Sequence, residues 1–178
     1  MNLIIDVGNS LAKVAVFDKG TIIFDSAIET DQVGAHIKDI FKRFPKIRRS
    51  IVSSVGNLNE NDFAVLSVFC PVHRLSHTSK VPFKNSYATP QTLGVDRIAL
   101  ATAAFYQNPN ANTLIIDAGT CLTYDMVNDY GEYLGGAISP GLTMRYRSLS
   151  EQTSKLPFLQ PEELFDYIGN STETSIHS

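Results

Sequence analysis

The chain has 178 residues, a formal net charge of −3 at neutral pH, and 43% hydrophobic residues. That length and apolar content suffice for one large domain or two small lobes with cores of their own. The slightly acidic balance excludes the basic stripe typical of nucleic-acid-binding proteins, so we expect no nucleic-acid partner. The short basic run at 46–49 precedes an apolar strand and is interpreted as a solvated helix end or loop.

Two cysteines, Cys70 and Cys121, lie far apart in apolar surroundings and do not form a disulfide framework. The first residues, MNLIID, carry neither a charged n-region nor a long apolar segment. This pattern matches neither a signal peptide nor a membrane span. We therefore expect a cytoplasmic protein with no membrane partner.

The first hundred residues predict alternating strands and helices. The predicted strands cover 2–7, 11–17, 21–24, 49–54 and 72–75, and the predicted helices cover 32–44, 60–68 and 95–106. Pro45 ends the first helix. The polar stretch 76–93 contains Pro82 and Pro90 and predicts a long loop, which in a compact domain is usually functional or disordered.

The second part of the chain begins with a near copy of the first. Residues 3–16 align without gaps on residues 114–127, and seven of the fourteen pairs are identical. The offset of 111 residues is too long for a solenoid repeat. The repeat indicates two lobes that each begin with a strand, an Asp-x-Gly turn and a second strand. A further strand is predicted at 132–138.

Each copy ends its first strand in Asp-x-Gly, at Asp6 and Asp117. A carboxylate at the end of a buried strand points into the crevice where α/β sheets bind ligands. The glycine lets the backbone approach a ligand, and the turn amides, with Asn9 and Ser10, can cradle phosphate oxygens. The aspartate can hold Mg²⁺ through water. Ordinary hairpin turns are the alternative, but two copies in matching contexts favour phosphate binding.

Four motifs then appear in order along the chain: Asp6–Ser10 (DVGNS), Gly94–Arg97 (GVDR), Asp117–Thr120 (DAGT) and Gly135–Gly141 (GGAISPG). Together with Tyr87 and the late Ile168–Thr172, this set resembles the type III pantothenate kinases of the acetate/sugar kinase, Hsp70 and actin superfamily. The resemblance covers essentially the whole chain. It implies a two-lobed actin-like α/β fold with ribonuclease H-like lobes at 1–108 and 109–178.

The resemblance also implies a set of site residues. ATP would bind the first loop, made of Asp6, Val7, Gly8, Asn9, Ser10, Leu11, Ala12 and Lys13, together with Thr120 of the second turn. Asp117 would hold a monovalent cation, K⁺ or NH₄⁺, and Asp6 would hold Mg²⁺ through water. Asp96 would be the general base. Pantothenate would contact Tyr87, Gly94, Val95, Asp96, Arg97 and Thr172, with Thr172 contributed by the partner in a homodimer.

The chemistry gives independent support to Asp96 and Arg97. A primary alcohol must lose its proton as it attacks the γ-phosphate, and a positioned carboxylate can accept that proton. An arginine is suited to binding the pantothenate carboxylate bidentately. The alternative is an acidic residue at a helix start beside a surface arginine. His73 and His77 are four residues apart, but a proline precedes them and a loop follows, which disfavours a metal pair.

Two departures from the family pattern affect these expectations. Ser10 stands where the family usually has Thr. The chain ends at Ser178, some dozens of residues earlier than family members, so the second lobe is expected to be incomplete, through partial order or natural truncation.

The main functional prediction is ATP-dependent phosphorylation of pantothenate to 4'-phosphopantothenate, the first step of coenzyme A biosynthesis. The alternatives are a non-enzymatic transcriptional accessory factor on the same scaffold, or another superfamily enzyme such as a sugar kinase or polyphosphate hydrolase.

Overall fold

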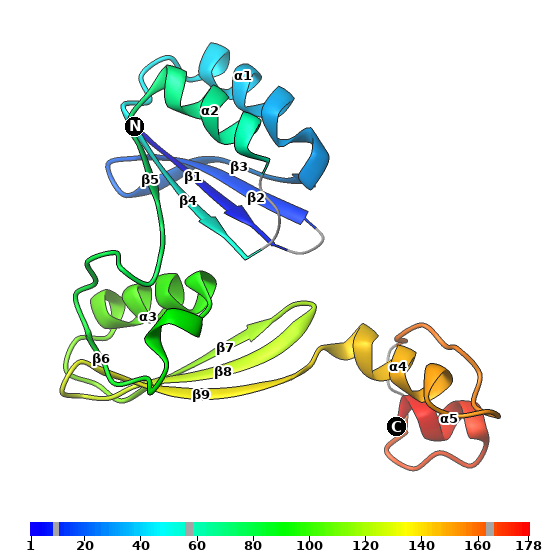
Figure 1. The fold of residues 1–178 in the computed structure, drawn as a ribbon. Helices are drawn as coiled ribbons and strands as arrows, with labels where there is room; N and C mark the ends of the chain where they lie inside the picture. Colours follow the sequence, from blue (N-terminus) through cyan, green and yellow to red (C-terminus); the bar gives the residue numbers. More distant parts are fainter. Residues whose placement is uncertain (9–10, 56–58, 163–165) are drawn as a thin grey trace.

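The computed structural model describes residues 1–8, 11–55, 59–162 and 166–178 (Figure 1). Its first sheet has five strands in the order β3-β2-β1-β4-β5. These strands are β1 (Asn2–Val7), β2 (Leu11–Asp18), β3 (Thr21–Glu29), β4 (Arg49–Ser54) and β5 (Val72–Arg74). The central strand β1 runs antiparallel to β2 and parallel to β4.

Two helices cover one face of the first sheet (Figure 1). They are α1 (Val33–Arg43), which follows the short η1 (Thr30–Gln32), and α2 (Glu60–Phe69). Alternate residues of β1 point toward these helices, and Leu3, Ile5 and Val7 are completely buried there. The phenyl rings of Phe41 and Phe69 stack at a centroid distance of 4.5 Å where the helices meet. Because side chains alternate along a strand, Asp6 lies on the opposite face.

The helix α3 (Val95–Gln107), preceded by η2 (Pro90–Thr92), lies between the two sheets (Figure 1). It contacts β4 of the first sheet and two strands of the second. Its buried side chains Ile98, Ala101 and Ala104 belong to the second hydrophobic cluster. The predicted lobe boundary at residue 108 assigns α3 to the first lobe. In the structure, the apolar face of α3 packs on the second sheet.

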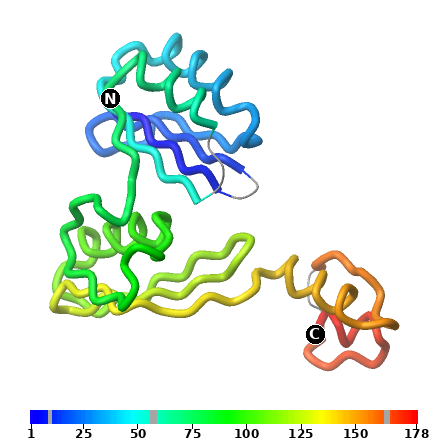
Figure 2. Tube along the Cα trace, in the orientation of Figure 1, coloured from blue at the N-terminus to red at the C-terminus, as the bar shows by residue number. Residues whose placement is uncertain are grey.

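The second sheet has four strands in the order β6-β9-β8-β7. They are β6 (Lys84–Asn85), β7 (Thr113–Ala118), β8 (Cys121–Val127) and β9 (Glu132–Pro140). The face toward α3 is packed. The opposite face of β7 leaves Leu114 and Ile116 60% and 58% exposed. Beyond β9, α4 (Leu142–Glu151) and α5 (Thr172–His177) extend away from both sheets (Figures 1 and 2).

The α/β fold class, with two sheets begun by similar hairpins, is confirmed. The third strand is longer than predicted, the expected loop 76–93 contains β6 and η2, and α4 was not predicted. The two hairpins also differ in register. Val7 pairs with Ala12 in the first, and Ala118 pairs with Leu122 in the second, so the second turn is one residue tighter. Within the described ranges, no helix has the length and apolarity needed to cross a membrane.

Candidate active site

The first Asp-x-Gly turn presents its carboxylate on the open face of the first sheet. Asp6 pairs across the sheet with Lys13 on β2 and with Ser53 on β4, so these three side chains share the face on the α3 side. The Ser53 hydroxyl is buried and has no hydrogen-bond partner in the described part of the chain. A carboxylate, an ammonium group and an unpaired hydroxyl are thus placed side by side.

The backbone of this turn is closed by a hydrogen bond in which the Gly8 N–H donates to the Leu11 carbonyl at 3.0 Å. Val7 and Ala12 are completely buried under the helices, so only their backbone groups are available to a ligand. Asn9 and Ser10, which the phosphate-cradle prediction includes, lie outside the described residues. The remaining members, Leu11 and Lys13, are exposed at the start of β2.

The second Asp-x-Gly turn has a different neighbourhood. Asp117 pairs with Thr123 on β8, and the buried Thr123 hydroxyl also lacks a hydrogen-bond partner among the described residues. The end of β9 lies against this turn, because the Gly141 N–H donates to the Thr120 carbonyl at 3.1 Å. A Cβ at position 141 would overlap that carbonyl and the one of Gly119, so only glycine permits this approach.

The Gly-x-Asp-Arg motif forms the start of α3. Gly94 is the N-cap residue and Asp96 lies in the first turn. The Arg97 backbone N–H donates to Asp96 Oδ1 at 2.8 Å. A Cβ on Gly94 would collide with the same carboxylate oxygen. The glycine therefore leaves the space that the Asp96 carboxylate occupies.

The Arg97 side chain points into the protein. Its Nε donates to both Asp125 carboxylate oxygens at 3.0 and 3.1 Å, and its Nη2 donates to Oδ1 at 2.6 Å. Arg97 is 5% exposed and Asp125 is completely buried. The hydrogen bond to Asp125 raises the pKa of the Arg97 guanidinium, against the lowering effect of burial. The pair is desolvated and joined by bidentate hydrogen bonds.

Tyr133 completes this buried group. Its hydroxyl donates to Asp125 Oδ1 at 2.6 Å, and its side chain is completely buried. Burial first, and the hydrogen bond to Asp125 second, raise the pKa of Tyr133 well above its ordinary value, so the hydroxyl keeps its proton. The Tyr87 ring lies 5.6 Å from the Arg97 guanidinium carbon and 6.1 Å from the Tyr133 ring. Tyr87 and Arg97 are therefore neighbours.

Sequence reasoning did not identify Asp125 or Tyr133. The assignment of Arg97 to the substrate carboxylate stays a prediction, and within the chain Arg97 pairs with Asp125. The available signal was Asp125 itself, a carboxylate between Tyr124 and Met126 in a strand that is otherwise largely apolar. A charge in such a strand needs a partner.

Residues 2–178 match the sequence profile of the type III pantothenate kinases. The chain belongs to this family. A relative named type III pantothenate kinase from Flavobacterium johnsoniae is 43% identical over 178 residues, which cover all of this chain and 73% of the relative. One of the same name from Christiangramia forsetii is 46% identical, with the same coverage.

A crystal structure from Campylobacter jejuni, titled as a conserved Baf family transcriptional activator, has a similar fold. Its TM-score is 0.59 at 24% identity, and the match covers 98% of this chain and 71% of that one. This level of identity supports the fold alone. The chain thus has the two-lobed actin-like α/β fold expected for a type III pantothenate kinase.

In this member of the type III pantothenate kinases, Thr172 lies away from the other predicted site residues. It is the first residue of α5, where the Ser171 and Thr174 side chains form a capping box. Figure 1 places α5 beyond the end of β9, far from α3. The structure therefore does not bring Thr172 to Asp96 within one chain.

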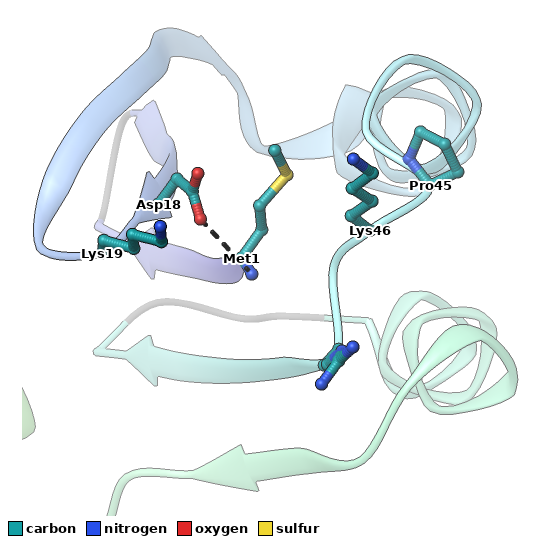
Figure 3. Close-up of a pocket in the computed structure, with 6 residues that line it drawn as sticks. Met1, Asp18, Lys19, Pro45 and Lys46 are labelled. Atoms are coloured by element: carbon teal, nitrogen blue, oxygen red, sulfur yellow. Dashed lines mark ion pairs between the residues drawn. The ribbon is translucent and has the colours of Figure 1, made fainter.

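An open pocket of about 600 Å³ lies elsewhere, at the beginnings of β1 and β4, opposite the end that carries Asp6 (Figure 3). Lys19, Lys46 and Arg48 contribute to its lining, and the Met1 amino group lies 3.9 Å from the Asp18 carboxylate. It contains none of the predicted site residues. His73 bonds to Ser79 at 2.9 Å, and no cluster of metal-ligating side chains occurs in the described ranges.

Proposed function

We propose that this protein transfers the γ-phosphate of ATP to the primary hydroxyl of pantothenate, which yields 4'-phosphopantothenate and ADP at the entry to coenzyme A biosynthesis. The observation that carries the proposal is the placement of three aspartates in a member of this kinase family. Asp6 lies on the α3 side of the first sheet, Asp117 on the α3 side of the second, and Asp96 at the start of α3 itself.

Asp96 acts as the general base in this proposal. One carboxylate oxygen accepts the Arg97 amide hydrogen, and we assign the other to the attacking hydroxyl of pantothenate. The carboxylate takes the proton as the new oxygen–phosphorus bond forms and the bond to ADP breaks. The room left by Gly94 allows this geometry without a clash.

The residues at the two turns suit hard cations. Ser53 lies beside Asp6 and Thr123 beside Asp117, and neither hydroxyl has a hydrogen-bond partner among the described residues. Carboxylate and hydroxyl oxygens are the ligands that Mg²⁺ prefers, and they also suit K⁺. We assign Mg²⁺ to Asp6 through water and K⁺ or NH₄⁺ to Asp117. Such ions, when bound, neutralise charge on the phosphates.

The ATP phosphates would lie between the two turns. In our assignment, residues 6–13 bind them from the first sheet, with Lys13 providing positive charge, and the exposed Thr120 binds them from the second. Pantothenate would then lie along the start of α3 against Tyr87, Gly94 and Val95. This order puts the substrate hydroxyl between Asp96 and the γ-phosphate.

The assembly we propose is a homodimer. Thr172 is in α5, which Figure 1 places away from α3 and its Asp96, so we assign Thr172 to the pantothenate site of the partner subunit. We do not assign the apolar face of α3 to the dimer interface, because Ile98, Ala101 and Ala104 pack on their own second sheet. Two free cysteines and a metabolic role agree with a cytoplasmic location.

A coupled assay of ADP release tests this function. We expect ADP release that depends on pantothenate, requires Mg²⁺ and is stimulated by K⁺. Release that is independent of any acceptor would instead indicate a phosphohydrolase. Release with a sugar but not with pantothenate would indicate a sugar kinase, and no release under any of these conditions would favour the non-enzymatic accessory factor.

A further inference from the structure

A buried carboxylate binds the Arg97 guanidinium along one edge only. The Arg97 Nε–H is shared between the two Asp125 oxygens at 3.0 and 3.1 Å, and one Nη2–H donates to Oδ1 at 2.6 Å. A guanidinium has five N–H groups. The N–H groups of Nη1 and the second one of Nη2 therefore stay available. The available Nη1–H and Nη2–H lie parallel, so they form a second fork that fits a carboxylate.

This second fork keeps access to its surroundings. Among the described residues, the fully enclosed side-chain oxygen and nitrogen atoms that lack a hydrogen-bond partner belong to Ser53 and Thr123. Nη1 of Arg97 also lacks a partner there but is not one of these enclosed atoms. Nη1 therefore contributes to the 5% of Arg97 that is exposed. Arg97 lies in the first turn of α3, where the helix dipole also favours negative charge.

Asp125 and Tyr133 prepare Arg97 before any ligand arrives. The Asp125 carboxylate is completely buried and compensates the charge of the guanidinium, so Arg97 can stay ordered in the interior. The Tyr133 hydroxyl donates to Asp125 Oδ1 at 2.6 Å and withdraws negative charge from that carboxylate. Repulsion between Asp125 and a second carboxylate on the far side of the guanidinium is thereby reduced. A binding group that is already ordered loses less entropy when its ligand binds.

We propose that Asp125 and Tyr133 are positioning residues for the acceptor substrate: they orient the Arg97 guanidinium so that its second fork binds the substrate carboxylate. This inference rests on the proposed function, because pantothenate is the acceptor that carries a carboxylate. It makes the preference for an anionic over a neutral acceptor depend on two residues that the substrate does not touch.

The kinetic test compares pantothenate with its neutral amide, in which –CONH₂ replaces the carboxylate. In the wild type, kcat/KM for pantothenate should exceed that for the amide by about 10- to 100-fold, the usual contribution of a charge-assisted pair. Asp125→Asn should reduce this ratio by about ten-fold, through a higher KM for pantothenate, and Tyr133→Phe by about three-fold. The values for the amide should change by less than about three-fold. An equal loss for both acceptors would indicate a merely structural role and overturn the proposal.

A double-mutant cycle tests whether Asp125 acts through Arg97. Arg97→Gln should reduce the ratio at least as much as Asp125→Asn, and the combined variant should reduce it no further than Arg97→Gln alone. Effects that multiply would contradict the proposal. Because Asp125→Asn leaves a buried cation without its partner, it can fail to fold. Arg97→Met, Asp125→Leu replaces the pair by apolar groups, should stay folded, and should use both acceptors about equally.

Matched controls come from exposed residues. Tyr130→Phe changes a tyrosine in the turn between β8 and β9, and Arg74→Gln breaks the exposed pair with Glu60. Neither variant should change the ratio between the two acceptors.

Calorimetric binding of each acceptor separates this inference from the proposed function, because it needs no phosphoryl transfer. We expect the wild type to bind pantothenate more tightly than the amide, and Asp125→Asn to lose that preference. This result without any turnover would sink only the proposed function. A wild type that does not prefer pantothenate, or Asp125→Asn with the wild-type preference, would overturn the inference.

Discussion

The two Asp-x-Gly hairpins share half of their residues, yet they stand in different surroundings. The first lies in a sheet with two helices on one face and α3 on the other side. The second lies in a sheet that α3 covers on one face, while its other face exposes Leu114 and Ile116. The neighbours of the two aspartates also differ. Lys13 and Ser53 flank Asp6, whereas Thr123 is opposite Asp117.

This difference shows that two similar sequence segments can favour different ligands. A lysine beside Asp6 favours an anion such as phosphate on that side. Beside Asp117, the Thr123 hydroxyl has no hydrogen-bond partner in the described part of the chain, which suits a cation. The second turn is tighter, and its Thr120 carbonyl accepts a hydrogen bond from the Gly141 N–H. We therefore expect substitutions at equivalent positions of the two hairpins to have distinct effects.

The largest effect is expected at Asp96, which we propose as the general base. Asp96→Asn keeps the size of the side chain and one acceptor but cannot take a proton. Turnover should fall by about 10²–10⁴-fold, the usual cost of losing a general base. Circular dichroism and thermal unfolding should remain as in the wild type. A kcat near the wild-type value would remove Asp96 from the role of base.

The next effect separates the two hairpins by their ions. In Na⁺ buffer without K⁺ or NH₄⁺, the activity of the wild type should fall by about ten-fold or more, because the cation that neutralises phosphate charge is lost. Asp117→Asn should lower activity in K⁺ and abolish the difference between K⁺ and Na⁺. Asp6→Asn should keep that difference and raise the Mg²⁺ concentration needed. Full wild-type activity in Na⁺ would contradict the assignment of K⁺ or NH₄⁺ to Asp117.

The third prediction concerns the dimer. Asp96→Asn and Thr172→Arg subunits should each be inactive alone. After mixing and subunit exchange they should regain about a quarter to a half of the activity, because one site of each mixed dimer is intact. Light scattering of each variant should give the dimer mass. No recovery despite proven exchange would mean that Thr172 acts within its own chain, or not at all.

The smallest effect is on alkaline stability and tests the second lobe alone. The pKa of Tyr133 is raised in the folded protein, so above about pH 10 the unfolded chain loses this proton while the folded one keeps it. Stability is therefore lost as pH rises, by about 1 kcal/mol between pH 9 and 11. Urea unfolding of Tyr133→Phe should lack this part of the loss. The Tyr130→Phe control should keep it, since Tyr130 is exposed.

Local patterns in the sequence predicted most of the fold. The apolar strands ending at Asp6 and Asp117, the helix that begins after Gly94 and the paired hairpins could all be identified from periodicity and turn residues. The partner of Arg97 could not, because Asp125 lies 28 residues away and meets it only when α3 packs on the second sheet. The different register of the second hairpin could not be predicted either, because a gapless alignment of the two copies cannot reveal a shortened turn.

The most direct test of the central claim follows the phosphate itself. Protein is incubated with ATP labelled in the γ-phosphate, pantothenate, Mg²⁺ and K⁺, and the products are separated and identified by mass. The account predicts label in 4'-phosphopantothenate, a strongly reduced yield with Asp96→Asn, and a reduced yield when Na⁺ replaces K⁺. Label that appears only in inorganic phosphate, or in no product at all, would contradict it.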